Sequence, residues 1–213
     1  MLDLKKYENV PTGNICDNMP ERKGCMDCGI KPLSDEMRVI GRAVTVACPP
    51  CDNLGIHRAM LAAGEGDVIV VDARGYTEAG TFGEMMAVAC RYKKIAGIVI
   101  DGACRDKKEI IDMGYPVFVR ACSPNGTFKN SVGIVNERIN CGGLTVEPGD
   151  IIVGDCDGVV VVPKADAEKY LEAGLAKNKK ENEQVKQLAA GVSTSDLYGF
   201  TEIFNKYANK TNN

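Results

Sequence analysis

The feature that most constrains the fold is the stretch at residues 97–109, which reads GIVIDGACRDKKE. It opens with an apolar β-branched run at 98–100, which is typical of a short strand buried on both faces. An acid and a glycine follow this run, and Arg105 and Asp106 come just before a predicted helix. A strand, a glycine turn, a charged pair and a helix form the arrangement in which an open α/β sheet binds ligands.

The charged pair supports two interpretations. Arg105 offers a planar fork for a substrate carboxylate, and Asp106 offers one oxygen ligand to a hard cation. Alternatively, Asp106 is the N-cap of the following helix and Glu109 is its capping-box partner. The sequence of this stretch alone leaves both interpretations open.

Strands and helices alternate through the first half of the chain, which predicts right-handed βαβ units and a parallel sheet. Between residue 120 and a long helix expected near the C-terminal end, short strands separated only by turns predict an antiparallel meander. The predicted fold class is therefore α/β, with a parallel half and an antiparallel half. The predicted parallel strands lie at 38–47, 68–72, 98–100 and 116–119, and the meander strands at 144–146, 151–153 and 159–162.

The two ends of the chain extend this domain. Residues 1–30 form a helical or irregular N-terminal extension, and a long polar helix is expected at about 165–190. We predict a single domain at 1–195, followed by a C-terminal helix and tail at 196–213. The long helix has a thin apolar stripe, which favours packing against a partner over packing on its own domain.

A second helix start lies on the same predicted sheet edge. The loop Thr81-Phe82-Gly83-Glu84 follows the strand at 68–72 and precedes the next helix. The free N–H groups of a helix start bind anions, and Gly83 allows a ligand to approach the backbone. A capping box between Thr81 and Glu84 is the alternative. Two helix starts lie on one edge of the predicted sheet, and together they carry two acids and an arginine. This arrangement favours a ligand-binding site over two separate helix caps.

Charge and hydropathy exclude several classes of partner. The net charge is −3, and no basic patch suggests nucleic acid. No apolar run has spanning length, and the first residues lack the apolar core of a secretory signal. We therefore expect a cytoplasmic protein that binds neither nucleic acid nor membrane.

The ten cysteines raise the question of a structural metal. Cys25 and Cys28 form one C-x-x-C pair, Cys48 and Cys51 form another, and nineteen residues separate the pairs, as in four-cysteine zinc sites. However, Cys48 follows a predicted strand directly and Cys51 leads into a helix, whereas zinc ribbons place each pair on its own tight turn. We predict reduced thiols and no zinc.

The spacing between the two helix starts resembles a known signature. Glu84, then twenty residues, then Arg105-Asp106 is similar to the acid-x20-Arg-Asp pattern of the RraA-like proteins. Further similar stretches are GDVIVVDA, VIDGACRD and GGLTVEPGDIIVGDCDGVVVVPK, so the resemblance extends over residues 38–195. The family includes class II pyruvate aldolases acting on 4-hydroxy-4-methyl-2-oxoglutarate and 4-carboxy-4-hydroxy-2-oxoadipate, proteins long named demethylmenaquinone methyltransferases, and regulators of ribonuclease E.

The resemblance implies a role for each residue of the signature. Asp106 is the single protein ligand of Mg²⁺ or Mn²⁺, and Arg105 holds the substrate and the oxyanion that develops on it. Beside Gly83, the backbone N–H groups of Met85 and Met86 bind the substrate carboxylate.

The resemblance also implies three features that extend beyond these residues. Glu84 orients a metal-bound water that serves as acid and base, although the aldolases carry Asp there. A glutamate from a neighbouring subunit completes the site, and it corresponds to Glu181, with Glu183 as the fallback. The family forms trimers or hexamers with the site at the subunit boundary.

These implications lead to a specific functional prediction. The fold is the swivelling β/β/α arrangement with C-terminal helices, and the protein is a metal-dependent lyase. It cleaves a 4-hydroxy-2-oxo acid to pyruvate by a retro-aldol reaction and decarboxylates oxaloacetate as a side activity. The alternative is a non-catalytic regulator that binds a ribonuclease or another protein, and Asp106 favours the enzyme. The loop at 121–141 and a neighbouring chain are expected to select the distal part of the substrate.

Overall fold

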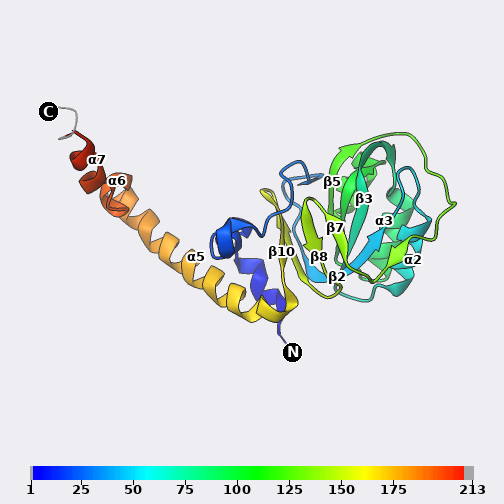
Figure 1. The fold of residues 1–213 in the computed structure, drawn as a ribbon, viewed down its shortest axis with the longest axis horizontal. Coiled ribbons are helices and arrows are strands. Elements are labelled where there is room, and N and C mark those ends of the chain that lie inside the picture. Colours follow the sequence, from blue (N-terminus) through cyan, green and yellow to red (C-terminus); the bar gives the residue numbers. More distant parts are fainter. Residues whose placement is uncertain (1, 209–213) are drawn as a thin grey trace. The chain divides into compact units, whose positions relative to one another are not determined.

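The computed structural model describes residues 2–208 of the chain (Figure 1). Strands are labelled β, α-helices α and 3-10 helices η. In chain order the elements are η1 (Leu4–Asn9), α1 (Thr12–Cys16), η2 (Pro20–Arg22), β1 (Lys31–Pro32), β2 (Val39–Ala47), α2 (Leu54–Ala62), β3 (Asp67–Gly80), α3 (Glu84–Tyr92), β4 (Gly97–Cys104), α4 (Lys107–Met113), β5 (Val117–Cys122), β6 (Ile134–Val135), β7 (Ile139–Cys141), β8 (Leu144–Val146), β9 (Ile151–Asp155), β10 (Gly158–Val162), η3 (Lys164–Asp166), α5 (Ala167–Ala189), α6 (Thr194–Leu197) and α7 (Phe200–Ala208).

The chain divides into two compact units within helix α5. The first ends at Gly174 and contains every strand of the described residues, and the second begins at Leu175. The predicted domain boundaries at 195 and 196 stay a prediction, and the tail at 209–213 lies outside the described residues. None of the helices within residues 2–208 combines the length and the apolar character that crossing a bilayer requires.

The main sheet has the order β1-β5-β4-β3-β2-β9-β10, with β6 beside β2. Strands β2 to β5 run parallel, whereas β1, β6, β9 and β10 pair antiparallel. The α/β fold with a parallel half and an antiparallel half is thus confirmed.

The predicted three-strand meander is wrong in one respect, because β8 pairs with β7 in a separate two-stranded sheet and does not pair with β9. The reason is burial. Ile139 and Val146 pack into the core on one face of the main sheet, so the β7–β8 hairpin covers that face, while β9 extends the edge at β2.

Each face of the sheet packs against a different layer. Ile98 and Ile100 of β4 point into a core shared with α2, α3 and α4. Helices α2 and α3 lie on one side of β3 in Figure 1. Val99 and Phe118 point the other way, into a core shared with β7, β8 and the N-terminal segment. Every residue of β4 is buried, as its apolar run predicts.

Strand β3 is much longer than predicted, and its irregular end positions the site. It pairs with β4 in regular register up to Asp72, then bulges outward through Arg74 and Gly75, both at positive φ. The chain pairs with β4 again at Tyr76, opposite Gly102, and after a second irregularity at Gly80, opposite Ala103. This detour brings the loop before α3 next to the end of β4.

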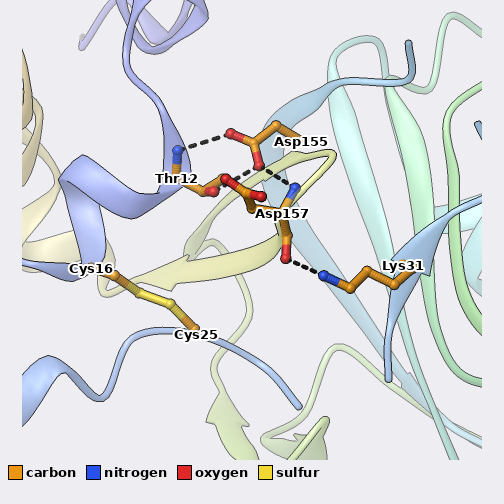
Figure 2. Close-up of a disulfide and its surroundings, with 6 residues drawn as sticks. All are labelled: Thr12, Cys16, Cys25, Lys31, Asp155 and Asp157. Carbon is orange, nitrogen blue, oxygen red and sulfur yellow. Dashed lines mark hydrogen bonds between the residues drawn. A yellow bond between two sulfur atoms is a disulfide. The ribbon is translucent and has the colours of Figure 1, made fainter. Parts of the chain in front are cut away.

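The N-terminal segment is fastened to the β9–β10 hairpin (Figure 2). The Thr12 N–H and hydroxyl both donate to the Asp155 carboxylate, at 2.9 and 2.7 Å. Nearby, the Met26 N–H donates to the β10 backbone. These contacts bring the Cα atoms of Cys16 and Cys25 to 6.4 Å, and the two residues form a disulfide. The prediction that all ten cysteines are reduced is therefore wrong at this pair.

Candidate active site

Asp106 occupies the N-cap position of α4, but its side chain does not cap that helix. Its backbone is left-handed, with φ 57° and ψ 42°, whereas capping side chains normally belong to extended residues. Instead, Asp106 Oδ2 accepts a hydrogen bond of 3.0 Å from the backbone N–H of Glu84 and lies 3.5 Å from Arg105 Nε. The capping box between Asp106 and Glu109 is therefore wrong.

The start of α3 also differs from a capping box. Its N-cap is Gly83, and Glu84 is its first residue. The Thr81 hydroxyl donates to the Ala103 carbonyl at 3.0 Å and contributes nothing to the helix. The first N–H of α3 is therefore satisfied by the carboxylate of Asp106, which belongs to the next strand–helix loop.

Two glycines allow these loops to approach each other. A Cβ atom on Gly83 would lie 2.5 Å from Asp106 Oδ2 and 3.2 Å from Arg105 Nε. A Cβ atom on Gly80 would lie 2.7 Å from Arg105 Cβ. The Arg105 N–H donates to the Phe82 carbonyl at 2.9 Å, which holds the two loops together. Gly83 thus leaves room for the Asp106 carboxylate.

A cleft of about 150 Å³ opens at this edge of the sheet. The side chains of Arg105 and Asp106 are 48% and 37% exposed. Asp106 Oδ1 has no hydrogen-bond partner among the described residues, so one carboxylate oxygen is available to a ligand. The cleft is lined by Asn53, Gly80, Thr81, Gly83, Met85, Met86, Arg105, Asp106, Gly126, Thr127 and Lys129.

The two amides expected to bind a carboxylate differ in availability. The Met86 N–H donates to the Gly83 carbonyl at 3.1 Å. The Met85 N–H has no acceptor within the described part of the chain. An anion at the start of α3 would therefore meet the Met85 N–H first.

The structure adds cleft residues that sequence reasoning did not select. Asn53 donates from Nδ2 to the Thr81 carbonyl at 3.0 Å, and its buried Oδ1 has no partner among the described residues. Lys129 adds a second cation to the lining of the cleft. Its loop follows the carboxyl end of β5. Because open α/β sheets bind ligands at the carboxyl ends of their strands, the position of this loop in the sequence could have identified Lys129.

Asp52 and His57 both interact with the loop that carries Lys129. Asp52 Oδ2 accepts the N–H groups of Asn130 and Ser131 at 2.6 and 3.1 Å. Burial and the charge of Lys129 lower the pKa of His57, which favours the neutral imidazole. His57 does not line the cleft, in keeping with its omission from the predicted catalytic residues.

The residues of the cleft fit a hard divalent cation. Asp106 contributes a carboxylate oxygen without a partner among the described residues, and Gly83 leaves room for that carboxylate. Glu84, the predicted acid–base residue, is not among the residues that line the cleft. Asp155, Cys156 and Asp157 form another group of side chains that could bind a metal. Unlike Asp106, Asp155 has no open oxygen, because both of its carboxylate oxygens accept hydrogen bonds from Thr12. That group forms a turn of the β9–β10 hairpin.

The two C-x-x-C pairs do not come together. Cys25 is bonded to Cys16, and burial raises the pKa of Cys48 to about 11. Within residues 2–208, no three of the four cysteines lie within 4.8 Å of one another. That these cysteines bind no zinc stays a prediction for elemental analysis.

The glutamates expected from a neighbouring subunit lie on α5, in the second compact unit. Glu181 Oε1 lies 3.6 Å from Lys177 Nζ, and Glu183 Oε1 accepts from Lys186 at 2.7 Å. Both acids are paired with lysines of their own helix, and their place in a second subunit's site stays a prediction.

Comparison with known proteins gives consistent matches. Residues 12–161 match the RraA-like family, described as Aldolase/RraA. A protein of Halalkalibacterium halodurans named "Putative 4-hydroxy-4-methyl-2-oxoglutarate aldolase" is 34% identical over 199 residues, which is 93% of each chain. A solved structure of an uncharacterized protein from Pseudomonas syringae has a TM-score of 0.80 at 26% identity, over 89% of both chains. Streptomyces coelicolor RraAS2, described as an unusual member of the RNase ES inhibitor RraA protein family, has a TM-score of 0.78 at 25% identity, over 86% of this chain and 96% of that one.

Proposed function

Because the chain belongs to the RraA-like family, we propose that it is a divalent-metal-dependent lyase that cleaves a 4-hydroxy-2-oxo acid to release pyruvate. The observation that carries the proposal is the Asp106 carboxylate, which has one oxygen free beside Arg105 in a small cleft. Asp106 would hold Mg²⁺ or Mn²⁺. When bound there, the cation supplies Lewis-acid polarisation of the 2-oxo group.

Arg105 and the start of α3 bind the reacting end of the substrate. The guanidinium is half exposed in the cleft, and its planar fork matches a carboxylate or a pair of oxygens. The Met85 N–H offers a second donor. Breaking the C–C bond next to a 2-oxo acid leaves an enolate, and Arg105 stabilises the charge that develops on its oxygen. Oxaloacetate decarboxylation leaves the same enolate, so it is the expected side activity.

Glu84 assists the proton transfers of the reaction. Its backbone N–H is fixed by Asp106, so the side chain starts from an anchored position at the first residue of α3. The carboxylate orients the water that removes the proton from the 4-hydroxyl and returns one to the enolate. The longer arm of Glu, compared with the Asp of the aldolases, shifts that water and favours a different substrate.

Lys129 binds the distal end of the substrate. It is an exposed cation on the opposite loop of the cleft, where it complements a second carboxylate. We therefore favour dicarboxylic 4-hydroxy-2-oxo acids as substrates.

The site is completed by Glu181 of a second chain in a homotrimer or homohexamer. Tyr170 and Leu171 of α5 are buried, but Val185 is 61% exposed, which leaves apolar surface for a partner. Inactive Asp106→Ala chains co-assembled with inactive Glu181→Ala chains should recover part of the activity. No recovery in mixed oligomers of verified composition would place Glu181 outside the site, with Glu183 as the next candidate.

A second candidate function is regulation of a ribonuclease, which the similarity to RraAS2 favours. A regulator of this kind needs no cation at Asp106. Binding to a ribonuclease that persists unchanged in Asp106→Ala, together with no turnover by the wild type, would support this function.

The test is pyruvate release from a panel of 4-hydroxy-2-oxo acids, with and without Mg²⁺. We expect turnover of at least one dicarboxylic member, loss with a chelator and recovery with Mg²⁺ or Mn²⁺. Asp112→Ala is the matched control for Asp106→Ala, because Asp112 is an exposed acid on α4 whose one ion pair within residues 2–208 is with Lys108. Absence of pyruvate from every substrate would contradict the proposal.

A further inference from the structure

Two cysteines stand side by side at the edge of the sheet that bears the cleft. Cys104 is the last residue of β4, Cys122 is the last residue of β5, and the two are direct partners in the parallel register. Their sulfur atoms lie 3.7 Å apart. We propose that Cys104 and Cys122 are a reversible dithiol–disulfide pair, a modification site whose oxidation alters the adjacent cleft.

The backbone is already positioned for the bond. Neighbouring strands lie about 4.8 Å apart, and disulfides join Cα atoms separated by about 4.4–6.8 Å. The Ser123 N–H donates to the Cys104 carbonyl at 2.9 Å, which holds the ends of the two strands together. The sulfur atoms therefore need to close from 3.7 Å to about 2.05 Å, which side-chain rotation with little backbone movement provides.

The two thiols differ in access, which suits a two-step reaction. Cys122 is exposed, whereas Cys104 is fully buried. Cys28 and Cys156 are also exposed, but neither is in contact with another sulfur among the described residues. A reagent in solution can therefore reach Cys122. Of these three exposed cysteines, Cys122 alone has a second thiol close enough to form a disulfide.

The oxidant is a low-molecular-weight disulfide such as oxidised glutathione. The Cys122 thiolate attacks one sulfur of the reagent, forms a mixed disulfide and releases one glutathione thiolate. The Cys104 sulfur then attacks Cys122 Sγ, and the second glutathione leaves with the proton that Cys104 gives up. Two cysteine thiols are oxidised, and one disulfide reagent is reduced to two thiols.

Oxidation is coupled to the cleft through the chain itself. Cys104 directly precedes Arg105, whose N–H is bound to the Phe82 carbonyl of the α3 loop. Drawing the Cys104 side chain toward β5 therefore shifts Arg105 and, through it, Asp106. This consequence rests on the proposed function, because it assumes that Asp106 holds a cation.

Peptide mapping tests the pair independently of any activity. After oxidised glutathione, trypsin should yield peptide 95–105 linked to peptide 121–129, each of which contains one cysteine. The link should disappear with dithiothreitol and in Cys122→Ser, and persist in the exposed-cysteine control Cys156→Ser. A mixed disulfide that stays on Cys122, or a link from Cys122 to another cysteine, would overturn the pair.

Mn²⁺ titration of the reduced and oxidised protein tests the coupling. We expect about tenfold weaker Mn²⁺ binding after oxidation, and no change in Cys122→Ser treated in the same way. Equal affinity in a protein that carries the disulfide would overturn the link to the cleft. A reduced protein that binds no Mn²⁺ would contradict the proposed function, while the peptide map would still decide the redox pair.

Discussion

Asp52 and Asp106 both lie between a parallel strand and the helix that follows it, yet the structure uses them in opposite ways. Asp52 is 4% exposed, and its two oxygens accept three backbone N–H groups. Asp106 is 37% exposed at its side chain, and only its Oδ2 is engaged, by the Glu84 N–H and Arg105. Both acids lie within two residues of a helix start.

The difference separates a structural acid from an acid that can bind a ligand. The carboxylate of Asp52 is saturated by backbone donors, so it can stabilise a loop but has no capacity for a cation. The carboxylate of Asp106 keeps an oxygen open at the edge of a cleft. Substitution of Asp106 should therefore reduce turnover far more than stability, and substitution of Asp52 should reduce stability far more than turnover.

The largest effect is expected for Asp106→Ala. It should reduce pyruvate release below detection, because it removes the one carboxylate that would hold the cation. The free energy of unfolding should fall by only about 1 kcal/mol, as for loss of a helix cap. Steady-state assays and urea unfolding measure the two quantities. A variant that retains turnover, or that unfolds, would show that Asp106 is structural like Asp52.

Arg105→Lys should be nearly as damaging as Arg105→Ala, with kcat/KM reduced by about 10²–10³-fold in both. An ammonium group is a point charge and cannot reproduce the planar fork of the guanidinium. Comparison of kcat/KM for the two variants is the measurement. If Arg105→Lys had a kcat/KM close to that of the wild type, Arg105 would supply only a positive electrostatic potential and not a specific geometry.

Gly83→Ala should weaken Mn²⁺ binding by about 10–100-fold, because the new Cβ would lie 2.5 Å from Asp106 Oδ2 and displace the carboxylate. Gly126→Ala is the matched control in the same cleft, since a Cβ there meets no atom within 4 Å. Metal titration of both variants separates the effects. Equal affinities would argue against Asp106 as the ligand.

Asp52→Asn should mainly affect stability, by about 1–3 kcal/mol at neutral pH, with far less effect on turnover than Asp106→Ala. Burial acts to raise the pKa of Asp52, but three backbone N–H groups hold it below its ordinary value of 3.8. Its contribution is therefore fully present above that value and lost as the pH falls through the lower folded pKa.

Urea unfolding between about pH 5 and pH 3 measures this loss. The wild type should lose more stability than Asp52→Asn over the interval, because the variant has no carboxylate to protonate at this position. Parallel curves for the two proteins would mean that Asp52 contributes no pH-dependent stability.

Local sequence determined most of the elements around the site. The helix predicted directly after Asp106 is α4, at Lys107–Met113, and the buried run at 98–100 lies within β4. Both predictions rest on short-range patterns: an apolar run too short for a helix, and a helix ended by a glycine. The same patterns placed Arg105 and Asp106 at the carboxyl edge of the sheet, where the cleft lies.

Other features depended on residues far apart in the chain. The detour of β3, the pairing of β8 with β7 and the Cys16–Cys25 disulfide all follow from contacts that no local pattern records. The spacing of the cysteines suggested a metal site, whereas the packing of α1 on the β9–β10 hairpin decided which two would meet.

By itself, the sequence determined that an arginine and an acid stand where a strand gives way to a helix, because local periodicity sets both elements. Only the tertiary structure decided what the acid does there. The close approach of the two loops at Gly83 and the left-handed backbone of Asp106 turn its carboxylate from its own helix to the start of α3. A side chain's direction depends on backbone dihedral angles and on neighbours, and here both are set by packing between α3 and α4.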